Sequence, residues 1–165
     1  DTHDRWDHLE QAIAYGNQAG CSVMLFAGDL VAPGQGVPML EKFNGPVHVV
    51  LGNNDGELVG LTRRIDKSGS VTLHYVSGES VMTETFDGLR FYMNHFPGFT
   101  RNAALSGQYD VCVHGHNHTY SEETLENGTL ILNPGELKGL KPDLASAMIF
   151  DTETKSVEKM VFDQR

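Results

Sequence analysis

Five short polar blocks in the 165-residue chain combine carboxylate, amide and imidazole side chains. In chain order they are Asp1-Thr2-His3, Gly28-Asp29, Gly52-Asn53-Asn54-Asp55, Asn94-His95 and Gly115-His116-Asn117-His118. Such side chains bind divalent cations, and because no block holds a cysteine they favour manganese, iron, cobalt, nickel or zinc over a thiolate zinc site. A pair of such cations is suited to hydrolysing phosphate esters. The blocks therefore predict a two-metal site with hydrolytic chemistry.

The spacing inside two of the blocks predicts which side chains act together. Asp1 and His3 are two positions apart, as are His116 and His118. In an extended segment, side chains at positions i and i+2 point to the same side, so each pair is expected to address one small volume. Asp29 is the natural bridge, because a carboxylate can present one oxygen to each of two cations.

The elements that position these blocks are predicted to alternate in the first part of the chain. Apolar runs over residues 22–27 and 47–51 predict buried strands that end at Gly28-Asp29 and Gly52-Asn53. Helices are predicted over residues 6–18, 37–43 and 57–66, with a loop over residues 33–36. Strands alternating with helices indicate a parallel sheet, whose ligands bind at the carboxyl ends of the strands. The motif positions and this fold rule therefore predict the same location for the metal site, at the carboxyl ends of the strands.

The second part of the chain is predicted to consist mainly of strands. These are expected over residues 71–75, 81–86, 89–95, 111–114, 119–125, 130–133, 145–151 and 157–163. Hairpin turns are expected at Asp87-Gly88 and Asn127-Gly128. A helical turn over residues 102–106 is expected to follow a break at Pro97-Gly98.

Composition sets the outer bounds on function. A chain of 165 residues with 39% hydrophobic and 21% charged residues is typical of one soluble globular domain. A formal net charge of -10 argues against a nucleic-acid partner, because such binding depends on clustered Lys and Arg. No apolar run is long enough to span a membrane. Cys21 and Cys112 are interpreted as small core residues of a reducing compartment, which favours a cytoplasmic location.

The order of the five blocks resembles the calcineurin-like metallophosphoesterase superfamily. That family's pattern is Asp-x-His, Gly-Asp, Gly-Asn-His-Asp/Glu, a lone His and then Gly-His-x-His, and the resemblance extends from Asp1 to about Asp151. One departure is Asn54, which stands where many members carry His. Asn at this place and the short length resemble the small single-domain phosphodiesterase branch. The resemblance implies a four-layer α/β/β/α sandwich of two facing mixed sheets with flanking helices.

The resemblance also implies that residues 1–165 form a single metallophosphoesterase domain. In the family pattern, the Asp-x-His block ends a buried first strand that lies centrally in one sheet. Because Asp1 is the first residue here, we expect such an apolar strand upstream of it in the native protein.

The same resemblance implies a ligand set for two divalent cations. The first cation would be bound by Asp1, His3, Asp29 and His118, and the second by Asp29, Asn53, His95 and His116. Manganese is the first expectation, with zinc, iron, nickel and cobalt as alternatives. A hydroxide bridging the cations would attack the phosphate in line. Two dications, two aspartates and a hydroxide leave a charge of about +1, which attracts a phosphodiester monoanion.

Four residues are predicted to act on the substrate. Asn54 and Asp55 are the candidate catalytic residues, with Asp55 orienting a neighbouring group; Asn54, Arg5 and Phe96 are candidates for substrate binding. A His at position 54 could protonate the leaving oxygen, whereas an amide can only donate a hydrogen bond. We therefore expect small activated phosphodiesters to be preferred substrates.

Several alternatives stay open from the sequence. A phosphomonoesterase is the rival within enzymes. A non-catalytic scaffold like the retromer subunit of this fold is the rival outside them, although that subunit has lost metal-ligating histidines that this chain keeps. The natural substrate and the oligomeric state are not set by the sequence, and a homodimer is one alternative. Outside the five blocks, His8, His48 and His74 are expected to be packing or surface residues, and His114 to fill a strand end.

Overall fold

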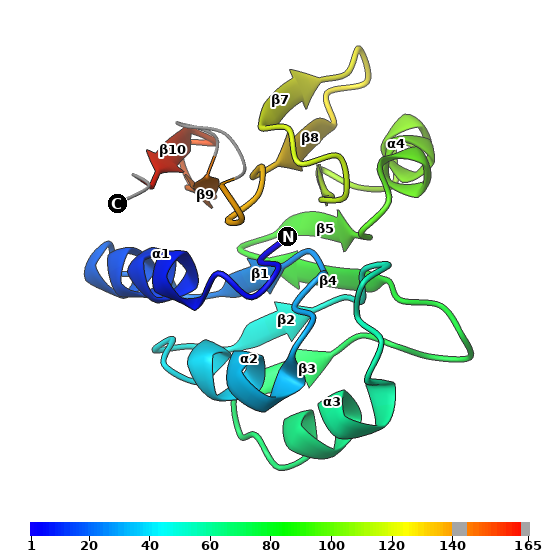
Figure 1. The fold of residues 1–165 in the computed structure, drawn as a ribbon. Coiled ribbons are helices and arrows are strands. Elements are labelled where there is room, and N and C mark those ends of the chain that lie inside the picture. Colours follow the sequence, from blue (N-terminus) through cyan, green and yellow to red (C-terminus); the bar gives the residue numbers. More distant parts are fainter. Residues whose placement is uncertain (140–144, 163–165) are drawn as a thin grey trace.

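The first half of the chain forms a parallel three-stranded sheet with helices on one side (Figure 1). The computed structural model describes residues 1–139 and 145–162. The strands are β1 (Met24–Phe26), β2 (Val47–Val49) and β3 (Val71–Leu73), and the helices are α1 (Trp6–Gln18), α2 (Pro33–Leu40) and α3 (Leu58–Ile65). The sheet has the order β1-β2-β3, so each strand lies beside the next along the chain. Figure 1 shows the start of the chain close to β1.

One apolar core joins this sheet to its helices. Leu9 and Ile13 of α1 pack in the same buried cluster as Val47 and Val49 of β2 and Leu61 of α3. Leu9 and Ile13 are four positions apart and so lie on one face of α1. This packing fixes the strands whose carboxyl ends precede the second and third polar blocks.

The second half of the chain forms a five-stranded mixed sheet of order β4-β5-β6-β8-β7. The bounds are β4 (Met82–Phe86), β5 (Leu89–Met93), β6 (Val111–Val113), β7 (Ser121–Thr124) and β8 (Leu130–Asn133), with α4 (Pro97–Leu105) after β5. The strands β5, β6 and β8 are parallel, whereas β4 and β7 run antiparallel at the edges. Because β5 and β6 are parallel, their carboxyl ends lie at the same edge of the sheet.

Two further cores cover the faces of the second sheet. Leu25 and Val50, from β1 and the end of β2, pack against Met82, Phe91 and Val113, so the two sheets face each other. On the opposite face, Ala104 of α4 packs with buried residues of β6 and β8, Cys112 and Ile131. The apolar layers therefore follow the order helices, first sheet, second sheet, helix.

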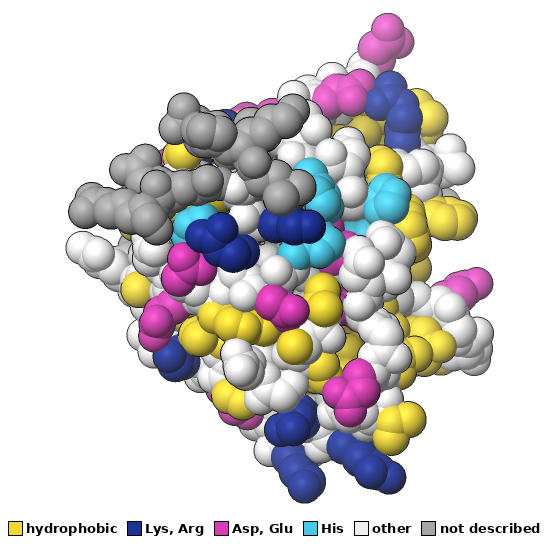
Figure 2. Space-filling view, viewed as in Figure 1, with side chains coloured by type: hydrophobic (Ala, Val, Ile, Leu, Met, Phe, Trp, Pro, Cys, Tyr) yellow, Lys and Arg dark blue, Asp and Glu magenta, His cyan; other side chains and the backbone are white. Residues whose placement is uncertain are grey.

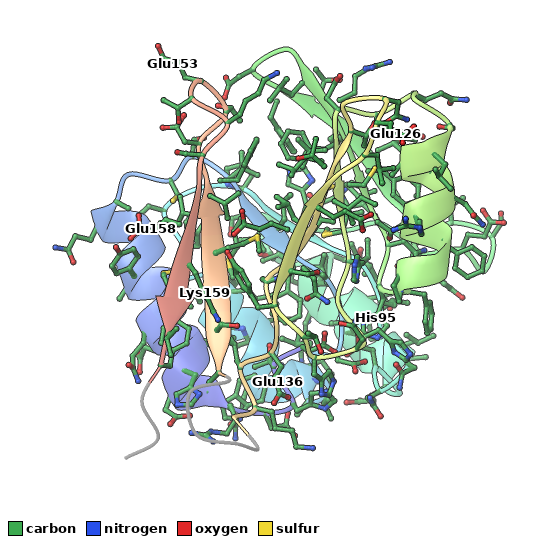
Figure 3. The ribbon with its side chains drawn as sticks, turned by 90° about the horizontal axis from the view of Figure 1, so that it is seen from above. His95, Glu126, Glu136, Glu153, Glu158 and Lys159 are labelled. Carbon is green, nitrogen blue, oxygen red and sulfur yellow. The ribbon has the colours of Figure 1, made fainter. Side chains whose placement is uncertain are left out.

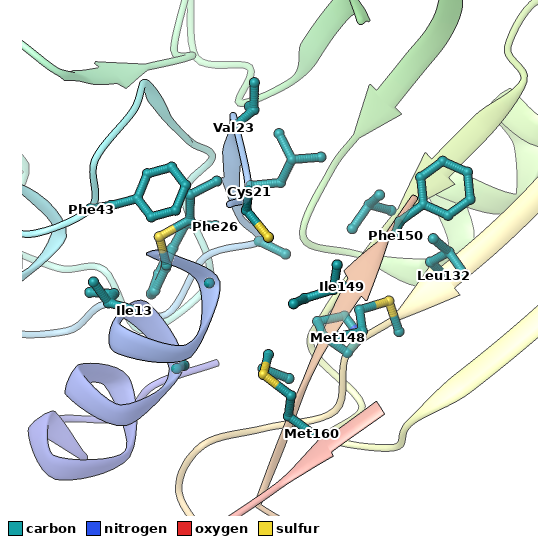
Figure 4. Close-up of a pocket in the computed structure, with 18 of the residues that line it drawn as sticks. Ile13, Cys21, Val23, Phe26, Phe43, Leu132, Met148, Ile149, Phe150 and Met160 are labelled. Atoms are coloured by element: carbon teal, nitrogen blue, oxygen red, sulfur yellow. The ribbon is translucent and has the colours of Figure 1, made fainter. Parts of the chain in front are cut away.

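A separate antiparallel pair, β9 (Ser146–Phe150) and β10 (Val157–Val161), lies across a cavity from β1. Among the described residues, β1 and β9 each pair with one strand only. The cavity between them has a volume of about 510 Å³. Figure 4 shows Phe26, Ile13, Met148 and Met160 around it, so its wall is largely apolar.

The α/β class predicted from the sequence is confirmed, with differences in the elements. The described strands form three sheets rather than two, and the first is wholly parallel rather than mixed. The predicted loop over residues 33–36 is the first turn of α2, and α4 begins at Pro97 rather than after it. Both prolines occupy the first helical position, where no intrahelical N–H bond is lost.

Other element predictions agree with the structure. The helix over residues 6–18 is confirmed, and Asp87 and Gly88 have φ values of 49° and 80° at the predicted turn between β4 and β5. The predicted strand over residues 157–163 ends at Val161, and Asp163 lies outside the described residues. Within the described part of the chain, no helix is long and apolar enough to cross a bilayer.

Candidate metal centre

The five polar blocks meet where four strands of the two sheets end. Asp29 follows β1, Asn53 follows β2, His95 follows β5 and His116 follows β6. In the space-filling view, histidine side chains gather at one place on the surface beside Lys or Arg side chains (Figure 2). The carboxyl ends of parallel strands therefore bring together residues that are far apart in sequence.

The first cluster consists of four ligand atoms from three blocks. His3 Nε2 lies 3.2 Å from His118 Nε2, and these nitrogens are 3.7 Å and 3.4 Å from Asp1 Oδ1. His3 Nε2 also lies 3.4 Å from Asp29 Oδ2. One atom from each of these residues fits within a group no wider than 4.8 Å. This is the set that the resemblance implies for the first cation.

The second cluster adjoins the first through Asp29. Asn53 Oδ1 lies 2.9 Å from both His95 Nε2 and His116 Nδ1, which are 3.3 Å apart. His95 Nε2 is 3.8 Å from Asp29 Oδ2, the oxygen that also faces His3. The structure thus brings all seven predicted metal ligands into two groups that share one carboxylate oxygen.

Asp29 is buried and held as an anion by its neighbours. Burial by itself would raise the pKa of its carboxyl, but hydrogen bonds from Asn54 and the nearby His95 and His3 outweigh it and lower that pKa. The backbone N–H of Asn54 donates to Oδ1 and its side-chain amide to Oδ2, both at 2.8 Å. A deprotonated carboxylate is the form that binds cations.

His95 is oriented before any cation binds. Its Nδ1 donates to the carbonyl oxygen of Ala27 at 2.8 Å, which leaves the Nε2 lone pair directed at the centre. Burial lowers the pKa of His95, although the hydrogen bond to Ala27 and the charge of Asp29 oppose the shift. Burial also lowers the pKa of His3. Both imidazoles are therefore favoured in the neutral form that ligates metals.

The backbone that presents the histidines differs from the extended form expected from the i, i+2 spacing. His3, His116 and His118 have φ values of 46°, 71° and 58°, in the left-handed region. Tight turns, not strands, therefore present these ligands. They place Asp1, His3 and His118 in the first cluster, whereas His116 lies in the second. Non-glycine residues adopt this region at an energetic cost and are found in it chiefly at constrained sites.

Two glycines of the blocks allow the strand ends to approach closely. Gly28 has a φ of 95°, and a Cβ there would lie 2.6 Å from the backbone nitrogen of Gly52. A Cβ at Gly52 would in turn overlap the carboxylate of Asp29. A side chain at either position would push apart β1, β2 and the shared ligand, so these positions require glycine.

Glu136, which sequence analysis missed, completes the contacts of His118. It lies in the loop after β8 and is buried, and its Oε2 is 3.1 Å from His118 Nδ1. Figure 3 shows Glu136 at the same end of the molecule as His95. A carboxylate on the far nitrogen of a ligating imidazole fixes the ring's orientation. The signal was present, because Asn133-Pro134-Gly135-Glu136 follows an apolar strand just as the other blocks do.

Asn54 and Asp55 contact the loop of Asp29. The carboxylate of Asp55 accepts hydrogen bonds from the backbone N–H groups of Asp29, Gly52 and Val31 at 2.8–2.9 Å. Asn54 is exposed and directs its amide to Asp29. Asp55 therefore holds the loops after β1 and β2 together, as expected of a residue that orients its neighbours, and its catalytic role stays a prediction.

The two other predicted substrate residues differ in their surroundings. The ring of Phe96 lies 4.9 Å from that of His116 and 5.0 Å from that of His95, so it borders the second cluster. Arg5 instead directs its guanidinium to Asp7, His8 and the carbonyl of Lys138. These contacts occupy Arg5 within the protein, whereas Phe96 forms an apolar wall beside the cluster.

The donor atoms of the centre fit divalent cations. Asp1 Oδ1 is buried and, among the described residues, accepts no hydrogen bond. A buried carboxylate oxygen without a donor is costly, and a cation at the centre of the first cluster would satisfy it. The remaining donors are imidazole nitrogens and amide or carboxylate oxygens, which suits borderline metals.

Comparisons with known proteins support the same family. The family model for a calcineurin-like phosphoesterase superfamily domain matches residues 1–155. Phosphodiesterase MJ0936 of Methanocaldococcus jannaschii is 28% identical over 99% of this chain and 96% of the relative. The solved structure of a novel archaeal phosphodiesterase has a TM-score of 0.84 and 28% identity, covering 98% of this chain and 96% of that one.

More distant structures share the fold alone. Vacuolar protein sorting 29 from Cryptosporidium parvum has a TM-score of 0.53 and 19% identity, covering 87% of this chain and 82% of that one. A predicted phosphoesterase from Streptococcus pneumoniae has a TM-score of 0.56 and 18% identity, covering 99% and 92%. The family match over most of the chain shows that this protein belongs to the calcineurin-like phosphoesterase superfamily and is a hydrolase acting on phosphate esters.

Proposed function

We propose that this phosphoesterase is a phosphodiesterase with a dinuclear metal centre and a small phosphodiester substrate. The observation that carries the proposal is the position of Asp29 Oδ2, which faces His3 Nε2 at 3.4 Å and His95 Nε2 at 3.8 Å. A carboxylate between two donor sets can bridge a pair of neighbouring cations. The relative of similar length, named a phosphodiesterase, supports the choice of substrate class.

The chain's own residues would position the metals and the substrate. Asp1, His3, Asp29 and His118 would hold one cation, and Asp29, Asn53, His95 and His116 the other. Bound divalent cations would neutralise the phosphate charge and make an attacking water more acidic. Asp55 and Glu136 would keep the ligands in place, since they bond the Asp29 loop and His118. Phe96 would limit the access of water on the side of His116.

Asn54 supports diesters over monoesters. Its amide is exposed beside the shared carboxylate and can donate a hydrogen bond to a phosphate oxygen, but it has no proton to give a leaving group. Hydrolysis would therefore depend on the cations and on a good leaving group. A phosphomonoesterase is the alternative for the same centre.

The donor atoms suggest the metal, and the free thiols suggest the cellular location. Manganese is the proposed metal, because six of the seven donors are carboxylates or imidazoles that bind it and none is a thiolate, with zinc, iron, nickel and cobalt competing by availability. Cys21 and Cys112 are free, and Cys112 is buried. A cytoplasmic location is proposed on that basis, because reducing compartments retain free thiols.

The decisive experiment compares bis(p-nitrophenyl) phosphate with p-nitrophenyl phosphate. The chelated protein should be inactive on both, and added Mn²⁺ should restore cleavage of the diester first. His116→Ala should abolish the restored activity, whereas His74→Gln, at a half-buried histidine outside the proposed ligand set, should keep it. Activity confined to the monoester would move the assignment to a phosphomonoesterase.

A non-catalytic scaffold is the second candidate, because vacuolar protein sorting 29 shares the fold. Metal content separates the two. We expect close to two manganese ions per chain after reconstitution, and about one fewer in His116→Ala. A chain that binds almost no metal and cleaves neither ester would be a scaffold.

We also propose that residues 1–165 act as one domain whose first sheet has room for another strand. Among the described residues, β1 and β9 each have an unpaired edge; both strands border the apolar cavity, and Asp1 and Thr2 also line it. An apolar extended segment joined to Asp1 could pair with both edges and fill the cavity. Such a strand would hold Asp1, a proposed metal ligand, in place.

A further inference from the structure

A second group of metal-ligating side chains lies apart from the proposed centre, where β2, β3 and β4 approach one another. His48 Nδ1 is 2.8 Å from His74 Nε2, and Glu84 offers a carboxylate oxygen within a group no wider than 4.8 Å. The residues of the centre are not part of this group. Both imidazoles are partly buried, and Glu84 is exposed, so the group opens to solvent.

The strand register explains why the two histidines meet. His48 pairs with Thr72 in the parallel ladder of β2 and β3, and residues 72 and 74 lie on the same face of their strand. The backbone N–H of His74 continues the ladder by donating to Val49 at 2.9 Å. Val47 and Val49 pack toward the helices, so His48 points to the other side, toward the second sheet.

Glu84 faces the histidines from the opposite sheet. It lies between Met82 and Phe86 in β4, and both neighbours pack in the core between the sheets. Glu84 therefore occupies an inward-facing position, where an apolar residue would extend the core. The ring of Phe86 contacts that of His48 edge to face at 5.4 Å, which places β4 directly against the histidine pair.

We propose that His48, His74 and Glu84 bind one zinc ion, separate from the proposed dinuclear centre. Two imidazole nitrogens and one carboxylate oxygen form a ligand set typical of zinc with a position left for water. Ligand nitrogens on a tetrahedral zinc lie roughly 3.3 Å apart, so the two rings need to separate by only about 0.5 Å. Because the ligands come from both sheets, the bound ion would cross-link β2 and β3 to β4.

The charge and protonation of the group support a cation over a simple histidine pair. Without metal, one ring nitrogen must donate to the other, and the carboxylate of Glu84 then faces two neutral rings. Burial lowers the pKa of His48 and of His74, which keeps their lone pairs available near neutral pH. A zinc ion would use both lone pairs and neutralise Glu84 in one step.

Zinc content at a fixed free concentration tests the proposal. Chelated protein would be dialysed against a zinc buffer, and bound zinc per chain would be measured by elemental analysis. We expect the protein to hold one ion more than the double variant His48→Gln/His74→Gln. Glu84→Gln should weaken this binding at least tenfold, whereas Glu79→Gln, which removes the same charge from a nearby exposed position, should leave it unchanged.

A measurement in a variant with a damaged dinuclear centre distinguishes zinc binding at this site from metal binding at that centre. In a His116→Ala protein, whose proposed centre is damaged, the zinc that depends on His48 and His74 should still bind. It should raise the thermal midpoint, and the ¹⁵N resonances of these two rings should shift. Equal zinc content in the protein and the double variant would overturn the proposal, as would equal affinity in Glu84→Gln and Glu79→Gln. Either result would leave the phosphodiesterase proposal untouched.

Discussion

At the scale of single residues, Asp29 joins the two halves of the centre. Its Oδ2 faces both donor sets, and Asn54 donates hydrogen bonds to both carboxylate oxygens. Asp29→Asn keeps the shape but loses the charge, so we expect the two cations to be bound more than about 100-fold more weakly. Manganese titration and diester hydrolysis would measure the loss. Asp66→Asn, at an exposed acid after α3, is the matched control.

Glu136 leads to a prediction about orientation rather than contact with a reactant. Its carboxylate lies 3.1 Å from His118 Nδ1. Glu136→Gln should weaken manganese binding by about 10- to 100-fold, because the amide cannot stabilise the ligating imidazole as the carboxylate does. Saturating manganese should restore most of the activity. Glu126→Gln, an exposed change of the same kind, should have no effect, and equal affinities in the two variants would show that Glu136 only fills space.

Residue types predicted the centre better than local backbone arguments did. The ligand atoms meet because polar residues follow apolar runs, and the ends of parallel strands converge. The i, i+2 argument paired Asp1 with His3 correctly but for the wrong reason, since His3 has a left-handed φ value. It was wrong for His116 and His118, which belong to different clusters. Glu136 was missed because a single acid after Pro134-Gly135 has the composition of an ordinary turn.

At the scale of elements, apolar spacing placed α1 correctly because its apolar face packs on the first sheet. Proline and glycine were misinterpreted at two helix starts. Pro33 and Pro97 begin α2 and α4, since a proline at the first helical position loses no hydrogen bond. Local sequence patterns could not predict which strands share a sheet. Whether β9 belongs to the same sheet as β1 depends on whether another strand fills the space between them.

The strands β2 and β3 carry a pH-dependent contribution to stability. Burial lowers the pKa of His48 and His74 below the ordinary value of 6.5, and Glu84, which faces both, opposes the shift. The unfolded chain therefore takes up protons at a higher pH than the folded chain, and stability falls as the pH drops through 6.5. Each imidazole contributes a slope below about 1.4 kcal/mol per pH unit.

Urea unfolding of metal-free protein at pH 7.5, 6.5 and 5.5 would measure this slope. His48→Gln/His74→Gln should lose less stability on acidification than the parent protein. The other histidines with a lowered pKa are present in both proteins, so their effect cancels in the comparison. Parallel curves for the two proteins would contradict the assignment.

The cavity between β1 and β9 leads to a prediction about an added strand. Each apolar side chain buried in it should contribute about 1.5 to 3 kcal/mol, and the strand would pair with two free edges. A short apolar segment fused before Asp1 should therefore raise the urea midpoint and tighten metal binding at the first cluster. A Gly-Ser segment of equal length is the control. Equal midpoints for the two fusions would show that the cavity accepts no strand.

At the scale of the whole molecule, the negative net charge of the protein repels the anionic substrate that the metal centre would attract. The chain carries a formal charge of -10, from 12 Lys and Arg against 22 Asp and Glu. Beyond about 10 Å, a phosphodiester monoanion meets the repulsion of the whole protein, whereas within the centre it meets the cations. Salt screens the first interaction much more than the second, because charges that are close and partly buried are screened less.

Raising the ionic strength from about 10 mM to 150 mM should therefore increase kcat/KM for an anionic diester severalfold and leave kcat nearly unchanged. Steady-state kinetics with saturating manganese at each salt concentration would measure both constants. Replacing two exposed acids, as in Glu122→Gln/Glu126→Gln, should reduce the salt dependence without changing kcat. A kcat/KM that falls with salt would show that the local charge of the centre, not the net charge of the protein, governs the approach of the substrate.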